Sequence, residues 1–287
     1  MQRPRIPKWF RHALGLVLVT GLFCAFSLSA HGQTVKEVHG KKEAPEEAEE
    51  VATDKTGEEL TKEATKALFE AQEAMKKDDF AGGRRFLTDY LATNPDPIPI
   101  VLWHMLGYSY SSEGNMEEAR KVFKRGHEAA PDDKELLLNL AIATWEVERF
   151  AEAAPLFEKI YATREEKDRK FLQQAAAAWY QAEKFLEAKR VLKQMLALPQ
   201  KPNPDWYQMI INICMELEQM DEAEDYVHQY LRLDPLKAEY WRLLAQFRLD
   251  KDDYRSAAGA LEISYAVKPP AKNKSWEDLA DLYAYLN

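Results

Sequence analysis

Residues Ile100–Asp133 read IVLWHMLGYSYSSEGNMEEARKVFKRGHEAAPDD, and their pattern predicts the architecture of most of the chain. Trp103, Leu106 and Tyr110 recur at the three- and four-residue spacing that places side chains on one face of a helix. After a short break that contains glycine, a second amphipathic run continues up to Pro131, which cannot extend a helix interior. The stretch therefore predicts two helices joined by a tight turn.

The same pattern recurs along the chain in phase. Each predicted second helix opens with an aromatic residue or methionine, namely Phe80, Met116, Phe150, Phe185, Met220 and Tyr254. A small residue follows three positions later each time, namely Gly83, Ala119, Ala153, Ala188, Ala223 and Ala257. The steps are 36, 34, 35, 35 and 34 residues. Because small side chains let two helix axes approach closely, the recurrence predicts a stack of antiparallel helix pairs.

The motif Trp103-x2-Leu106-Gly107-x2-Tyr110, followed by Ala119, Phe123 and Pro131, resembles the tetratricopeptide repeat (TPR). The resemblance implies an all-α fold, a right-handed TPR superhelix. Six units are predicted, with approximate bounds 64–97, 100–133, 134–168, 169–203, 204–237 and 238–271. A seventh first helix follows in Trp276-x2-Leu279-Ala280-x2-Tyr283. Its apolar face is expected to form a lid, to dock a partner or second copy through residues 275–287, or to be covered by a continuation of the natural protein.

The amino-terminal residues indicate export. Met1–His12 carries four cations and no acid, Ala13–Ala30 is largely apolar, and Ala30-His31-Gly32 places small residues at a cleavage site. We therefore expect a signal peptide at 1–32, with an uncleaved membrane anchor as the alternative, and a periplasmic or envelope-associated protein. Residues 33–60 are rich in Glu and Lys without an apolar period, which predicts an acidic disordered linker before the solenoid at 61–287.

Charge and residue types argue against several classes of function. The formal net charge is −9, and −13 once the four cations of Met1–His12 are removed, so binding to nucleic acid or to an anionic membrane surface is not expected. The six histidines show no metal-ligand spacing, and Cys214 is the cysteine that remains after the leader. The chain has no glycine-rich phosphate loop and no nucleophile motif. We predict a non-catalytic protein without cofactor or metal.

The TPR resemblance implies that the first helices line a concave groove through the second, fifth, ninth and twelfth positions of each unit. The candidate partner-binding residues at these positions are His104, Tyr108, Trp145, Gln173, Tyr180, Gln208, Asn212 and Arg242. Aromatic rings give a large contact area and amides can pair with a peptide backbone, so the groove suits an extended peptide or a helix of a partner protein. In the alternative, Trp145 and Tyr180 only pack between neighbouring first helices. His104 and Arg242 are expected at ordinary surface positions.

Resemblance also separates possible partners. Cochaperones that bind the acidic end of heat-shock chaperones carry a clamp of basic and amide residues, whereas this chain has His104, Tyr108, Asn139, Lys170 and Gln174 at the matching places. Two basic groups are lost, so such a partner is not expected. Residues 240–286 resemble the end of TPR proteins that accompany TonB-type systems. The main hypothesis is an adaptor of a bacterial envelope; the alternative is a carbohydrate- or wall-associated protein, or a non-catalytic TPR arm of a larger enzyme complex.

Overall fold

The computed structural model describes residues 60–94, 98–164, 168–199, 202–270 and 273–286. Over these ranges the chain folds into helices, with no strand. The helices are α3 (Lys62–Met75), α4 (Phe80–Thr93), α5 (Ile100–Ser112), α6 (Met116–Ala129), α7 (Lys134–Glu146), α8 (Phe150–Thr163), α9 (Lys170–Gln181), α10 (Phe185–Leu196), α11 (Pro204–Glu216), α12 (Met220–Leu233), α13 (Ala238–Asp250), α14 (Tyr254–Val267) and α15 (Asn273–Leu286). The all-α prediction is confirmed. The predicted signal peptide and residues 33–59 of the predicted linker lie outside the described residues, so those boundaries stay predictions.

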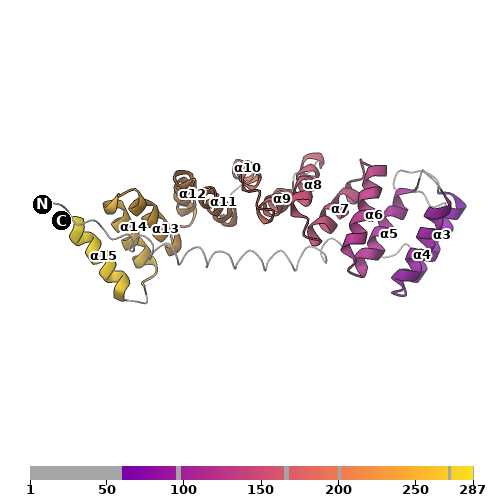
Figure 1. The fold of residues 1–287 in the computed structure, drawn as a ribbon, viewed down its shortest axis with the longest axis horizontal. Coiled ribbons are helices and arrows are strands. Elements are labelled where there is room, and N and C mark those ends of the chain that lie inside the picture. Colours follow the sequence, from indigo (N-terminus) through magenta and orange to yellow (C-terminus); the bar gives the residue numbers. More distant parts are fainter. Residues whose placement is uncertain (1–59, 95–97, 165–167, 200–201, 271–272, 287) are drawn as a thin grey trace. The chain divides into compact units, whose positions relative to one another are not determined.

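The helices fall into two compact units, which divide between Pro199 and Gln200. In the first unit, α3–α4, α5–α6, α7–α8 and α9–α10 pack as helix pairs, and each second helix also packs on the first helix of the next pair (Figure 1). In the second unit, α11–α12 and α13–α14 pair in the same way, and α15 packs on α14. The six residues predicted to open second helices are the first residues of α4, α6, α8, α10, α12 and α14.

Each turn between paired helices has the same backbone geometry. One residue adopts a left-handed conformation, with φ between 56° and 61° at Asp78, Glu148, Glu183, Glu218 and Asp252, and 76° at Gly114. The amide of the next residue donates to a carbonyl five positions back, as from Lys184 to Trp179 at 2.9 Å. This is the Schellman arrangement, which satisfies carbonyls at the end of a helix and reverses the chain.

Close approach of helices explains the small residues. A Cβ added at Gly107 would overlap the ring of Phe123, so the aromatic ring of α6 lies directly on the backbone of α5. Gly126 of α6 has the same role in reverse, since a Cβ there would lie 2.9 Å from the Cβ of Trp103. Glycine at both points lets α5 and α6 pack at backbone contact.

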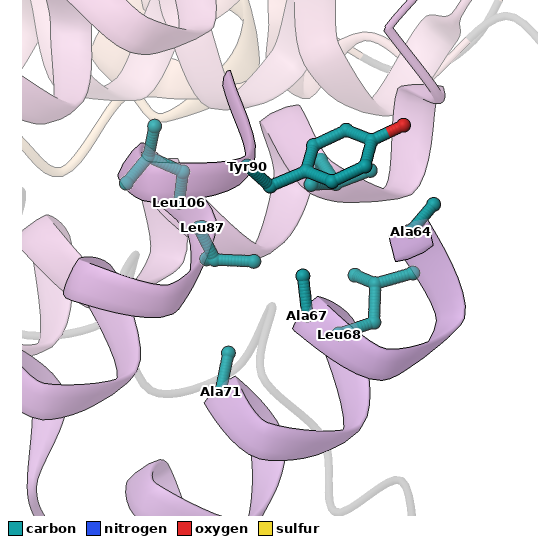
Figure 2. Packing of buried hydrophobic residues seen from close by; sticks show 8 residues of the cluster. Ala64, Ala67, Leu68, Ala71, Leu87, Tyr90 and Leu106 are labelled. Carbon is teal, nitrogen blue, oxygen red and sulfur yellow. The ribbon is translucent and has the colours of Figure 1, made fainter. Parts of the chain in front are cut away.

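The cores are built from the first-helix and second-helix faces together. One cluster joins α3, α4 and α5 through Ala64, Ala67, Leu68, Ala71, Leu87, Tyr90, Leu102 and Leu106, most of which Figure 2 labels. A second joins α5, α6 and α7 through Trp103, Ala119, Phe123, Leu136, Leu140 and Ala143. Helices α4, α5 and α6 therefore bury side chains against both of their neighbours, which fixes the orientation of the faces left open.

Candidate partner-binding face

Five candidate residues lie in the first unit, on α5, α7 and α9; we call His104, Tyr108, Trp145, Gln173 and Tyr180 the first-unit face. Helices α5 and α7 pack directly on each other as neighbouring first helices. Tyr108 is 42% exposed, and the other four residues are partly buried. The first-unit face therefore offers one open aromatic ring on a helix framework.

The aromatic rings of this face are held by phenylalanines that open second helices. The Trp145 ring meets Phe150 at a centroid distance of 5.0 Å with the planes 74° apart. Tyr180 meets Phe185 at 5.6 Å and 62°, five residues along the chain in both cases. These edge-to-face contacts run from a first helix to the second helix of the same pair, so packing of Trp145 and Tyr180 involves the turn as well as the helix stack.

Tyr108 is held from the preceding pair. Its ring lies 6.3 Å from Phe80, the first residue of α4, at 66°. An edge-to-face contact fixes the ring without covering it, and this is consistent with its exposed surface. Tyr108 is thus both oriented and open.

The expectation of an ordinary surface position for His104 is wrong. Its side chain is 14% exposed, and Nε2 lies 3.2 Å from Oδ1 of Asp133. The same carboxylate oxygen accepts hydrogen bonds from the amides of Glu135 (3.0 Å) and Leu136 (2.7 Å), which caps the N-terminus of α7. His104 therefore borders the cap that positions α7, and little of it is available to a partner.

The other three candidates lie in the second unit; we call Gln208, Asn212 and Arg242 the second-unit face. Gln208 and Asn212 stand four residues apart on α11, which places them one above the other on the same side of the helix. Arg242 lies on α13 and is partly buried, near enough to Tyr265 for its charge to influence the phenol. Each unit therefore carries its own part of the predicted groove.

Buried tyrosines stand behind Gln208. The rings of Tyr230 and Tyr240 are 4.1 Å apart, and Tyr207 lies 6.3 Å from Tyr230. Burial raises the pKa of Tyr230 to about 12, helped by the charge of Asp234, while a hydrogen bond with the Gln208 side chain acts in the opposite direction. The Gln208 amide also faces the Tyr240 hydroxyl, although that hydroxyl has no partner at hydrogen-bonding geometry. Burial therefore keeps both phenols neutral across the physiological range, and the contact with Tyr230 orients the Gln208 amide.

Two family models match the chain, and both describe the tetratricopeptide repeat. One covers residues 100–143 and the other covers 179–247, so a match falls in each unit. The chain is a TPR protein. No curated protein sequence matches it.

Solved structures share the TPR fold at low sequence identity. The Naa15/Naa10 complex bound to HypK-THB matches with a TM-score of 0.61 and 17% identity over 77% of this chain. The match covers 33% of that chain, so this protein spans about a third of its length. YrrB, described as a TPR protein with an unusual peptide-binding site, matches with a TM-score of 0.44 and 14% identity. The match covers 69% of this chain and 97% of YrrB. A TPR protein from Parabacteroides merdae matches with a TM-score of 0.41 and 13% identity, and the match covers 79% of this chain and 100% of that one.

These comparisons define the general class of function. TPR folds are scaffolds for protein–protein interaction, and the family models that match describe TPR repeats alone. Over the described ranges, no three His, Cys, Asp or Glu side chains gather as a metal site would require. Within the same ranges, every helix is too short or too polar to traverse a bilayer.

Sequence analysis missed an ionic cluster in the second unit. The Glu224 side chain of α12 is 5% exposed and lies 2.6 Å from both Nη2 of Arg248 and Nζ of Lys251. Lys251 also pairs with Asp221, and hydrogen bonds to Asp221 and then Glu224 raise the pKa of the lysine. The cluster joins α12 to the end of α13. The paired acids and bases lie 24 to 30 residues apart along the chain, so only a repeat-by-repeat alignment of charges could have indicated the cluster.

Sequence analysis also did not single out most of the exposed apolar side chains. They are Phe69, Phe86, Leu186, Leu233, Leu236 and Ile263. Leu236 lies in the turn before α13, beside Pro235, whose carbonyl accepts a hydrogen bond from Nε1 of Trp241 at 2.8 Å. The periodic pattern predicts which residues share a helix face but says nothing about turns, so the exposure of Leu236 could not be predicted from it.

Proposed function

We propose that this TPR protein is an exported, non-catalytic adaptor of a bacterial envelope that holds a peptide or subunit of a partner protein on the first-unit face. The observation that carries the proposal is Tyr108, a 42% exposed ring that Phe80 holds in place. Large rings that are already oriented lose little conformational entropy on binding, and such residues dominate binding energy at protein interfaces.

Neighbouring side chains complete a peptide-binding surface. Trp145 and Tyr180 are partly exposed and braced by Phe150 and Phe185, so they add apolar area without new ordering. Gln173 on α9 supplies an amide that can donate to and accept from a peptide backbone. A surface of aromatic rings and an amide suits an extended peptide segment better than it suits the charged carboxyl terminus of a partner protein.

The envelope part of the proposal rests on residues 1–32, whose basic, apolar and small-residue order is that of a secretory signal. The resemblance of residues 240–286 to TonB-associated TPR proteins directs the first search for a partner to energy-transducing envelope systems. Mass spectrometry of the amino terminus of the exported chain tests this part. A new terminus at residue 33 is expected, and an intact Met1 on a cytoplasmic protein contradicts it.

The binding part is tested by affinity purification of the full chain from an envelope fraction, with and without Tyr108→Ala plus Tyr180→Ala. We expect a stoichiometric protein partner that the double variant loses. Phe69→Ala plus Leu186→Ala removes two exposed apolar side chains elsewhere in the same unit and serves as the matched control. Retention on peptidoglycan without any protein partner would favour the wall-associated alternative and reject the adaptor.

A further inference from the structure

Helix α15 carries a first-helix signature that no helix covers within residues 202–270 and 273–286. Trp103 of α5 is 3% exposed beneath α6, whereas Trp276, at the same position of the signature, is 46% exposed. Ala280 is exposed, although Gly107 and Ala245 at the equivalent position are buried. The face formed by Trp276 and Ala280, which we call the α15 face, is therefore exposed where the equivalent Trp103 and Gly107 of α5 are buried.

The opposite side of α15 is firmly packed. Leu279 and Leu282 are buried, and Tyr285 meets Tyr254 of α14 at 5.0 Å. Trp276 itself lies edge-on to Tyr265 at the same distance. The helix is thus anchored on α14, and the α15 face is presented in a fixed orientation, which lowers the entropy cost of docking.

The remainder of the chain shows what kind of element fits such a face. In the α5–α6 pair, a helix places a small residue, Ala119, and one turn later a large one, Phe123, against the signature. Phe123 lies on Gly107, the counterpart of Ala280. The α15 face therefore matches an α-helix with a small residue followed four positions later by a large apolar residue.

The acidic residues beside the α15 face favour a partner helix that carries positive charge. Glu277 and Asp281 are exposed and stand next to Trp276 and Ala280 on the helix. Asn273–Leu286 contains three acids and one lysine, so a second α15 would bring like charges together. A helix with cations along one edge would instead pair with Glu277 and Asp281.

We propose that the α15 face docks a cationic amphipathic helix of a partner protein, in the position that a second helix takes in the other pairs. This surface is separate from the first-unit face and does not depend on the function proposed for it. Its occupant is recognised by an apolar stripe of small and large residues and by flanking lysine or arginine.

A suitable probe is a helix-stapled synthetic peptide with the sequence of α10, Phe185–Leu196. It has the Ala188…Leu192 spacing, three cations and one acid. Binding to the full-length chain is measured by fluorescence anisotropy of the labelled peptide. A second peptide, in which the three cations are replaced by glutamate, controls for charge.

We expect the cationic peptide to bind, and Glu277→Lys plus Asp281→Lys to weaken it about tenfold, through lost attraction and new repulsion. Ala280→Leu should weaken it by at least about tenfold by blocking close approach. Glu216→Lys plus Glu218→Lys, a charge reversal at exposed positions of the same unit, should leave the affinity within about twofold.

Four results would overturn the proposal. They are equal binding of the acidic peptide, unchanged affinity of the Glu277→Lys, Asp281→Lys chain, absence of binding to the full chain, and a dimer by light scattering that Ala280→Leu dissociates. The last result would assign the α15 face to a second copy. Circular dichroism of each variant verifies that it keeps the helical content of the unsubstituted chain.

Discussion

Trp103 on α5 and Trp276 on α15 occupy the same position of the same helical signature, yet the first is buried and the second is half exposed. Both helices pack on the second helix of a preceding pair, and only α5 has a second helix of its own over the signature among the described residues. The difference shows that the signature specifies what a helix can pack against, while the presence of a covering helix decides whether the face is core or surface. Four changes test this distinction.

Truncating the two tryptophans should give the largest contrast. Trp103→Ala removes a ring that packs with Phe123 and Leu136, and should lower the free energy of unfolding by about 3–5 kcal/mol. Trp276→Ala loses chiefly its edge contact with Tyr265 and should cost about 1 kcal/mol. Urea denaturation followed by circular dichroism measures both. Equal losses would mean that the α15 face is as buried in solution as its counterpart.

Adding volume at the small position should have the next largest effect. Gly107→Ala forces the ring of Phe123 to move, and overpacking of this kind should cost about 2 kcal/mol. Ala280→Val adds volume at an exposed position and should change stability by less than about 0.5 kcal/mol. The same denaturation experiment measures these changes. A destabilised Ala280→Val chain would show that something already covers α15.

Substitutions at the left-handed residue of a turn should change stability in opposite directions, depending on whether glycine is removed or introduced. Gly114 has φ 76°, so Gly114→Ala should destabilise by about 1 kcal/mol because of the left-handed conformation. Glu183 has φ 56° in the equivalent turn between α9 and α10, so Glu183→Gly should stabilise by a smaller amount, reduced by the flexibility of glycine in the unfolded chain. Thermal denaturation measures opposite shifts in Tm. Shifts of the same sign would reject the left-handed geometry.

Acidification should slightly weaken the contact between α6 and α8. Nε2 of His127 on α6 lies 3.0 Å from Nζ of Lys159, which can donate to it only while the imidazole is neutral. Burial, and then the charge of Lys159, lower the pKa of His127 from its usual 6.5, while Asp133 and Glu128 oppose the shift. The unfolded chain therefore binds the proton more readily, and the stabilisation present above pH 6.5 declines as the pH falls below that value.

The effect at His127 should be a few tenths of a kcal/mol, because the imidazole is only partly buried and solvent screens its contact with Lys159. It is measured as the stability difference between the unsubstituted chain and His127→Gln at pH 7.5 and pH 5.5. His104 is present in both chains and cancels. We expect the unsubstituted chain to lose stability relative to the variant on acidification, and a relative gain would contradict the sign. Helix α15 contains no histidine, so the environment of Trp276 should not respond.

Periodic features of the fold could be predicted from the sequence, and contacts between distant segments could not. The openings of the second helices follow from six in-phase residues because each one begins an amphipathic run. Pro155 would be expected to end a helix, yet α8 continues through it. Pro155 is exposed, so the carbonyl that loses its amide partner lies where water can satisfy it.

The candidate site shows the same limit. Trp145 and Tyr180 were selected by their place in the repeat, but their bracing by Phe150 and Phe185 depends on the geometry of the turn. His104 looked like a surface residue because its partner Asp133 lies 29 positions later, beyond the second helix. The position of a residue in the repeat predicts its face, whereas its availability to a partner depends on capping and turn contacts that vary from unit to unit.

The Glu224 cluster has a consequence for how the second unit unfolds. In a solenoid, neighbouring repeats can separate one at a time when their interfaces are weak. Separating α12 from α13 would break the ion pairs of the buried Glu224 carboxylate with Arg248 and Lys251 at the same time. Losing the partners of a buried charge costs much free energy. Amides on α11–α14 should therefore exchange with solvent in a single cooperative event instead of fraying inward from α15.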